Sequence, residues 1–335
     1  MELGLTTFAE MTAVGDRPAP SAGQRLREVV DEAVATERAG LEVYGVGEHH
    51  RADFAASAPT VVLSAIAART ERIQLTSAVT VLSSADPVRV YQEFATLDLL
   101  SGGRAELMAG RGSFIESFPL FGYDLGDYDE LFDEKLALLL KIRADEPVTW
   151  SGKFRAPLSD AVVYPRTERP LPVWIAVGGT PESVARAGLL GLPLAIAIIG
   201  GQPARFKPLV DLYHRALAEG GHEPRPVAVH AHGYVAETDA QAVNDFYAPY
   251  AAAMSAIGRE RGWAPMTRDH FDALRSQSGS LFVGAPDHVA EKIATVRDDL
   301  GLDRFMLHTS VGTLPHEKVL RTIELLGDKV APQVR

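Results

Sequence analysis

The sequence predicts an α/β protein, specifically a (β/α)8 TIM barrel that forms a single domain over residues 1–335. Short apolar segments typical of strands alternate with longer segments of helical spacing, about eight times along the chain. Such alternation favours a parallel sheet. No segment has the composition of a domain linker, and no GxGxxG motif follows the first strand. A closed barrel is therefore favoured over a doubly wound sheet.

The first half of the chain supplies four strand–helix units. The strands are expected at 2–8, 42–47, 73–81 and 105–110, and the helices at 24–40, 59–70, 87–103 and 127–145. Glycine and proline support several of these limits. Gly40 ends the first helix, while the third begins with Pro87 and stops at Gly102 and Gly103, as helices commonly do.

The second half continues the pattern but interrupts it twice. Strands are expected at 172–179, 193–199, 226–236 and 304–308, and helices at 181–191, 203–219, 239–259, 287–299 and 315–327. Residues 146–170 combine turn residues with short alternating runs, which predicts a small β-hairpin excursion. Residues 260–284 are polar and without clear periodicity, which predicts an irregular insertion late in the chain.

Composition excludes several classes of protein. The net charge is −11 and no Lys/Arg cluster is present, which argues against a nucleic-acid partner. The absence of cysteine excludes disulfides, thiolate nucleophiles and cysteine-based zinc sites. No apolar run reaches the roughly 18–20 residues of a membrane span. No secretory signal is visible at the N-terminus, so a cytoplasmic protein without a membrane partner is expected.

Barrel active sites form at the C-terminal ends of the strands, and two of these ends suit an anion. Gly178, Gly179 and Thr180 precede a helix that begins with Pro181, and a helix N-terminus favours phosphate. Arg111 follows the fourth strand between two glycines and could form a fork with a phosphate. An ordinary strand–helix turn and a surface salt bridge are the alternatives. At one face of a barrel, however, both features suit one phosphate.

Histidines also mark three strand ends. His49 and His50 are adjacent, so strand alternation would direct one toward a pocket and the other behind it; neither is expected to bind metal. His230 and His232 are two positions apart and share a face. They could bind zinc together with His308, or they could simply form part of the barrel wall with hydrogen-bond partners.

Four segments together carry a family resemblance: "GLEVYGVGEHH", "SAVTVLSSADPVRVYQEFATLDLLSGGRAELMAGRG", "FPLFGYD" and "PVWIAVGGTPESVARAGLLGLP". In this order and spacing, the chain resembles the bacterial luciferase-like family of flavin-dependent monooxygenases over most of its length. The resemblance implies a (β/α)8 barrel that binds FMN at its C-terminal face. It also implies a homodimer, and a reduced flavin that reacts with O2.

The resemblance also assigns roles to individual residues. It implies that His49 faces the flavin. In the mechanism expected on this basis, His49 is the catalytic group, as an acid/base or hydrogen-bond donor, and Glu48 orients His49 or holds the backbone. It implies a non-proline cis peptide at Ala78–Val79 that supports the flavin ring. It assigns contacts with the flavin phosphate to Arg111, Gly178, Gly179 and Thr180.

Two regions qualify the resemblance. Gly110 stands where luciferase has a reactive cysteine, so light emission is not implied. Residues 260–284 stand where luciferase has a mobile lid, and we expect a lid here.

The expected function is that of a monooxygenase using reduced FMN and O2 on a small organic substrate. No NAD(P)H-binding motif is apparent, so a separate flavin reductase would supply the reduced FMN. Three alternatives remain open. They are a reductase of the same fold that uses deazaflavin F420, a zinc hydrolase built on the histidines of strands seven and eight, and a non-catalytic flavin-binding protein.

Overall fold

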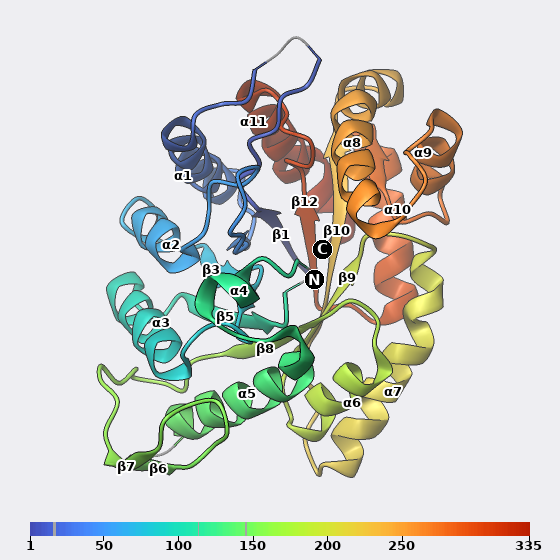
Figure 1. Cartoon of the computed structure of the whole chain (residues 1–335). Helices are drawn as coiled ribbons and strands as arrows, with labels where there is room; N and C mark the ends of the chain where they lie inside the picture. Colours follow the sequence, from blue (N-terminus) through green and yellow to red (C-terminus); the bar gives the residue numbers. More distant parts are fainter. Residues whose placement is uncertain (16–17, 113, 145) are drawn as a thin grey trace.

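The computed structural model describes residues 1–15, 18–112, 114–144 and 146–335, and over these residues eight parallel strands close into a barrel ringed by helices (Figure 1). Around the barrel the strands are β1 (Glu2–Thr7), β2 (Val43–Val46), β3 (Gln74–Ser77), β5 (Ala105–Gly110), β8 (Val173–Val177), β9 (Leu194–Ile198), β10 (Val227–Val235) and β12 (Arg304–His308). Parallel pairing of β12 with β1 closes the ring. The predicted TIM barrel and its eight strands are confirmed.

The helices follow the strands as predicted. The main ones are α1 (Ala22–Arg38), α2 (Pro59–Ala67), α3 (Pro87–Ser101), α5 (Tyr128–Ala144), α6 (Pro181–Leu189), α7 (Lys207–Glu219), α8 (Asp239–Arg261), α10 (Pro286–Leu300) and α11 (His316–Leu325). Short elements are α4 (Ser117–Phe121), α9 (Arg268–Arg275), α12 (Ala331–Val334), η1 (Leu125–Asp127), η2 (Pro203–Phe206) and η3 (Leu326–Val330). The last position of the helix predicted at 127–145 lies outside the described residues. In the described part of the chain, no helix combines the length and apolar character needed to cross a membrane.

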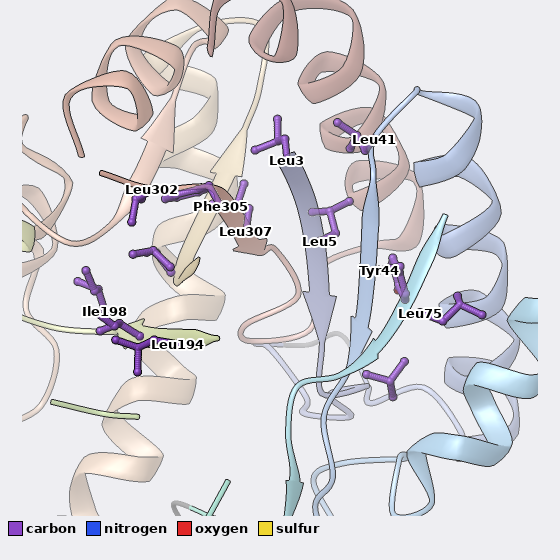
Figure 2. Packing of buried hydrophobic residues seen from close by; sticks show 14 of the residues in the cluster. Leu3, Leu5, Leu41, Tyr44, Leu75, Leu194, Ile198, Leu302, Phe305 and Leu307 are labelled. Atoms are coloured by element: carbon purple, nitrogen blue, oxygen red, sulfur yellow. The ribbon is translucent and has the colours of Figure 1, made fainter. Parts of the chain in front are cut away.

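The hydrophobic core lies mainly between the barrel and the helices. Outward-facing strand residues such as Leu5, Tyr44 and Leu307 are almost fully buried there, and Figure 2 shows such side chains on the strands. Because side chains alternate along a strand, the positions between them face the barrel interior. The interior holds a smaller apolar layer.

Charged residues fill the N-terminal end of the barrel interior. The Arg304 guanidinium donates to both carboxylate oxygens of Glu106 at 2.6 and 3.1 Å, and to Glu2 at 2.6 Å. It also lies 4.5 Å from the centre of the Trp174 ring. These groups and the apolar layer occupy the N-terminal part of the barrel interior. The cavity inside the described part of the barrel lies toward the C-terminal ends of the strands.

The structure departs from the simple strand–helix repeat at two places in the first half of the barrel. The predicted strand 73–81 is divided into β3 and β4 (Thr80–Val81), because the chain bends away at 78–79. The predicted hairpin is confirmed: β6 (Val148–Trp150) and β7 (Leu158–Ala161) pair antiparallel.

The prediction of an irregular segment at 260–284 is wrong in part. It contains helix α9, and it contains β11 (Phe282–Gly284), which pairs with β10. Thr267 caps α9 by accepting from the backbone N–H of His270, and Phe271 is fully buried. Helix α9 has only eight residues, and its apolar face consists of Phe271 and the partly buried Leu274, so it is shorter than the window over which helical periodicity is recognised in a sequence.

The buried ion pairs of the lower barrel allow a stability prediction. Glu106→Ala would leave the Arg304 guanidinium buried without its main partner, and this is expected to lower the free energy of unfolding by about 3–5 kcal/mol. The matched control is Glu237→Ala, whose partner Arg321 is half exposed, and which should cost less than about 1 kcal/mol. Urea denaturation measures both values. Equal small losses in the two variants would contradict a structural role for the buried pair.

Candidate active site

A cavity of about 480 Å³ opens at the C-terminal end of the barrel. Its volume lies within the range of about 300–1,000 Å³ that is typical of small-molecule sites. Six of the seven predicted site residues line it: His49, Ala78, Val79, Arg111, Gly178 and Thr180. The seventh, Gly179, does not line the cavity. Its φ of 114° is a backbone conformation that favours glycine, so Gly179 turns the chain between its two neighbours.

The peptide bond between Ala78 and Val79 is cis, as the resemblance implied. The backbone N–H of Ala78 donates to the carbonyl of Val46 at 2.8 Å, and the N–H of Glu48 donates to the carbonyl of Val79 at 3.2 Å. On the other side, a Cβ atom at Gly110 would lie 2.7 Å from a methyl carbon of Val79. The bend at 78–79 is therefore enclosed between the ends of β2 and β5, and it forms part of the cavity wall.

His49 lies in an aromatic setting at the edge of the cavity. Its ring stacks on Phe54 with 4.3 Å between centroids, and it meets Phe8 and Phe114 edge-on at 4.7 and 5.2 Å. Its Nδ1 lies 3.9 Å from a carboxylate oxygen of Glu116. Partial burial alone would raise the pKa of Glu116, but the His49 imidazole and nearby backbone N–H groups outweigh burial and lower it. A charged carboxylate thus faces His49, and the sequence interpretation had missed this partner.

Glu48 holds His50 and the backbone, and it makes no such contact with His49. One carboxylate oxygen lies 2.8 Å from Nε2 of His50, and the other accepts from the backbone N–H of Val81 at 2.9 Å. His50 also lines the cavity, so the expectation that it packs behind the site is wrong. The strand β2 ends at Val46. The alternation of an extended strand therefore no longer applies at His50.

The two features expected to bind an anion lie in the same cavity. Helix α6 begins just after Thr180, whose side chain does not cap the helix, so helix N–H groups remain available to a ligand. A Cβ at Gly178 would meet no other atom within 4 Å. Arg111 follows the neighbouring strand β5, which pairs with β8. It forms an ion pair with Asp129 and lies 5.1 Å from the centre of the Tyr128 ring. This arrangement suits a phosphate group.

His230 of β10 and His308 of β12 are hydrogen-bonded residues of the barrel wall, whereas Nδ1 of the buried His232 has no hydrogen-bond partner. Nε2 of His230 lies 3.3 Å from Nδ1 of His308, whose Nε2 lies 2.5 Å from a carboxylate oxygen of Glu10. Of these three residues, only His230 lines the cavity. Within the described ranges, no group of three or more His, Cys, Asp or Glu residues is placed so that it could hold a metal ion. His230 and His308 thus have the hydrogen-bond partners expected of histidines in a barrel wall.

Comparison with known proteins agrees with the barrel fold. The family model described as luciferase-like monooxygenase matches residues 1–304. The chain belongs to this family, whose members are oxidoreductases.

Two relatives and one solved structure illustrate the range of the family. The chain is 26% identical over 317 residues to a 4-hydroxyprotoasukamycin monooxygenase of Streptomyces nodosus subsp. asukaensis, covering 88% of this chain and 83% of that protein. It is 26% identical over 336 residues to an F420-dependent glucose-6-phosphate dehydrogenase of Segniliparus rotundus, covering 92% and 94%. The oxygenating constituent of 3,6-diketocamphane monooxygenase from Pseudomonas putida, solved in complex with FMN, shares the fold with a TM-score of 0.81 at 21% identity, covering 100% of this chain and 99% of that one.

The enclosure of the bend at 78–79 allows a test by substitution. Gly110→Ala would force Val79 to move, and this is expected to lower the free energy of unfolding by about 1–3 kcal/mol. The matched control is Gly200→Ala, because Gly200 lines the same cavity and a Cβ there meets nothing within 4 Å. Urea denaturation provides the measurement. If both variants are as stable as the parent, Gly110 does not hold the bend in place.

Proposed function

We propose that the chain is a flavin-dependent monooxygenase that uses reduced FMN and O2 on a small organic substrate. The observation that carries the proposal is the meeting of three features in one cavity. A helix N-terminus and Arg111 form an anion site, the bend at Ala78–Val79 forms a wall, and His49 stands at the edge. A mononucleotide with a flat ring and one phosphate matches this combination.

The described residues fit FMN on their own chemistry. The open space at Gly178 and the uncapped start of α6 suit the phosphate. The wall beyond them is largely apolar, with Val79, Met108 and Ala176 among its residues, and suits a flavin ring. When bound and reduced, the flavin supplies the electrons for oxygen chemistry. The protein binds it, orients it and limits the access of water.

His49 is the group proposed to hold or move a proton beside the ring. An imidazole serves as acid or base near neutral pH. The stacked Phe54 and the edge-on Phe8 fix the plane of the His49 ring, and the charged carboxylate of Glu116 can stabilise the imidazolium form. Glu48 contributes by holding His50 and Val81 of β4 in place.

An F420-dependent reductase is the second candidate function. Relatives named for F420 and for oxygenation match over similar lengths, so the choice rests on the site. F420 carries an anionic glutamate tail beyond its phosphate. The Asp129 carboxylate, which pairs with Arg111, opposes such additional negative charge and supports FMN.

Partners belong to the same proposal. A separate flavin reductase would supply the reduced FMN. We propose a homodimer because apolar side chains are exposed on the neighbouring helices α2 and α3: Val61 is 68% and Leu100 72% exposed.

The lid also remains a prediction, with Arg261 and Trp263 as its residues on the cavity wall. A cytoplasmic location stays a prediction as well.

The phosphate site is tested by comparing FMN with riboflavin, which lacks the phosphate. Arg111→Gln removes a charge-assisted hydrogen bond of about 1.5–3 kcal/mol, so the Kd for FMN is expected to rise about 10- to 100-fold. The Kd for riboflavin should stay within about threefold, since the ring contacts are unchanged. Arg186→Gln is the matched control, because Arg186 also forms an ion pair with an aspartate but does not line the cavity. Equal weakening of both ligands by Arg111→Gln would place the phosphate elsewhere.

His49 is tested by separating binding from turnover. His49→Ala should retain FMN, because the anion site is untouched. It should slow oxygen uptake by protein supplied with reduced FMN about 100-fold or more, as expected when an acid or base is removed. FMN fluorescence quenching and an oxygen electrode measure the two quantities. His214→Ala, on the exposed face of α7, is the control. Unchanged oxygen uptake in His49→Ala would remove His49 from the mechanism.

A further inference from the structure

A second set of titratable residues lies beside the cavity, on the other side of Phe8 from His49. The Phe8 ring is 4.7 Å from the ring of His49, 4.3 Å from that of His308 and 6.0 Å from that of His230. Glu10 follows β1, while His230 and His308 belong to β10 and β12. The role proposed for His49 uses none of these three residues.

The three side chains form a continuous line toward the cavity. One carboxylate oxygen of Glu10 lies 2.5 Å from Nε2 of His308, and Nδ1 of His308 lies 3.3 Å from Nε2 of His230. His308 is completely buried. His230 is only partly buried and lines the cavity. The line therefore begins inside the protein and ends at a ring that a ligand can touch.

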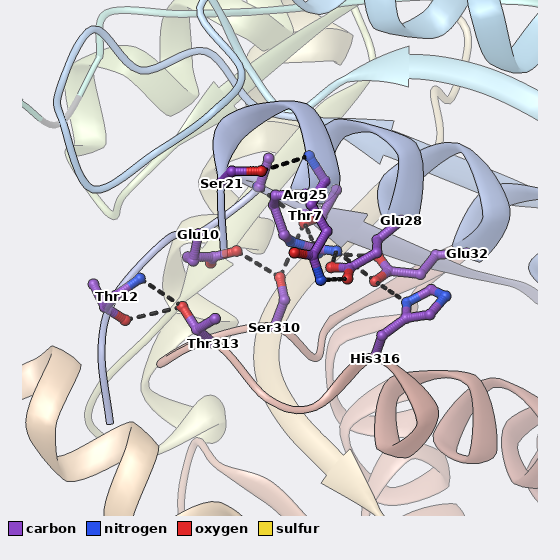
Figure 3. A network of polar contacts seen from close by, with 12 residues as sticks. Thr7, Glu10, Thr12, Ser21, Arg25, Glu28, Glu32, Ser310, Thr313 and His316 are labelled. Carbon is purple, nitrogen blue, oxygen red and sulfur yellow. Dashed lines mark hydrogen bonds and ion pairs between the residues drawn. The ribbon is translucent and has the colours of Figure 1, made fainter. Parts of the chain in front are cut away.

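Glu10 is held in its ionised form. Burial alone would raise its pKa, but His308, the Ser310 hydroxyl and the more distant Arg25 outweigh burial and lower the pKa to about 2. Figure 3 shows the network behind it: Ser310 donates to Glu10 at 2.6 Å and contacts Thr7 at 3.0 Å, and Arg25 donates to Thr7 at 3.3 Å. This network fixes the carboxylate as a permanent hydrogen-bond acceptor.

The ionised carboxylate sets the positions of the protons. An ionised carboxylate can only accept, so Nε2 of His308 carries a proton and donates it. In neutral His308 the other nitrogen, Nδ1, must then accept, and Nε2 of His230 donates to it. This leaves Nδ1 of His230 as the unprotonated nitrogen for a ligand in the cavity. It is the same logic by which a buried aspartate fixes the tautomer of a catalytic histidine.

We propose that Glu10, His308 and His230 form a proton relay that serves substrates carrying a hydroxyl group, such as alcohols and phenols. The hydroxyl proton passes to Nδ1 of His230, the proton on Nε2 of His230 passes to Nδ1 of His308, and the resulting imidazolium rests beside the Glu10 carboxylate. No electrons are transferred, and the reverse steps return the proton. His230 is the catalytic member, and His308 and Glu10 are positioning residues. The relay depends on the proposed function in one respect: that function determines which reaction the relay serves.

The surroundings favour His308 as the resting place of the proton. Burial, with the nearby His308 and His232, lowers the pKa of His230, and burial with His308 lowers that of His232 to about 3. Both rings are therefore neutral at neutral pH, with a single ring proton each. The other titratable groups that face the relay are Arg25 of α1 and Tyr250 of α8, whose ring lies 5.9 Å from that of His232. Glu10 is the carboxylate in direct contact with His308.

The proton positions are tested by NMR on the full-length protein without flavin. With ¹⁵N-labelled histidine, and with assignments from His230→Gln and His308→Gln, the two-bond correlations report which ring nitrogen carries the proton. The relay predicts a proton on Nε2 in both neutral rings. A proton on Nδ1 in either ring would overturn it.

Proton transfer is tested with 4-nitrophenol, whose phenolate form absorbs visible light. One pH unit below its own pKa, the phenolate band should rise about fivefold on addition of the protein, equivalent to a fall of about one unit in the probe's pKa. The ¹⁵N shifts of His308 should move toward the imidazolium form at the same time. Glu10→Gln should reduce the rise to less than about twofold. His308→Gln interrupts the relay at a second position and should have the same effect.

Glu237→Gln is the control, because Glu237 is half exposed and does not line the cavity, and this variant should retain the full rise. If Glu10→Gln behaves like Glu237→Gln, or if 4-nitrophenol at millimolar concentration perturbs neither its own spectrum nor the His230 signals, the relay is overturned. Because neither measurement uses flavin, failure of the relay would not contradict the FMN proposal, which the FMN-binding and oxygen-uptake experiments test separately.

Discussion

The enclosure of the bend at Ala78–Val79 between β2 and β5 is the constraint on which the site depends. Hydrogen bonds to Val46 and from Glu48 fix one side of the bend, and Gly110 provides the room for Val79 on the other. Glu48 then connects this bend to His50 and to Val81 of β4 through its two carboxylate oxygens. The cavity wall and the histidine pair are therefore parts of one hydrogen-bonded unit, so that a change in one displaces the other.

The barrel buries charge at two levels and for two purposes. At the N-terminal end, Arg304 and Glu106 satisfy each other and contribute to packing, with no access to the cavity. At the C-terminal end, Glu10 and His308 are equally buried, but they connect to His230, which reaches the cavity. The apolar layer between them separates the two groups. A buried charge needs partners that stabilise it. At the N-terminal end this pairing contributes to stability, and at the C-terminal end we propose that it also serves proton transfer.

The sequence predicted the features that depend on local pattern. Strand and helix alternation gave the barrel, and proline and glycine positions gave helix limits such as Pro87 and Gly102. Arg111 and the turn before α6 could be placed in one site because strand ends of a barrel share a face. Glu10 and Glu116 could not be recognised, since their partners, His308 and His49, are set by the closed fold rather than by sequence spacing. His50 was misplaced because alternation ends where β2 ends.

The most direct test of the account is which cofactor the cavity prefers. Absorption titration of the purified protein with FMN and with F420 gives both dissociation constants under one set of conditions. The anion site of Arg111 and α6, the apolar wall and the Asp129 carboxylate beside Arg111 predict tighter binding of FMN, with the flavin bands shifted on binding. Tighter binding of F420, with no change in the FMN spectrum, would contradict the proposed flavin monooxygenase.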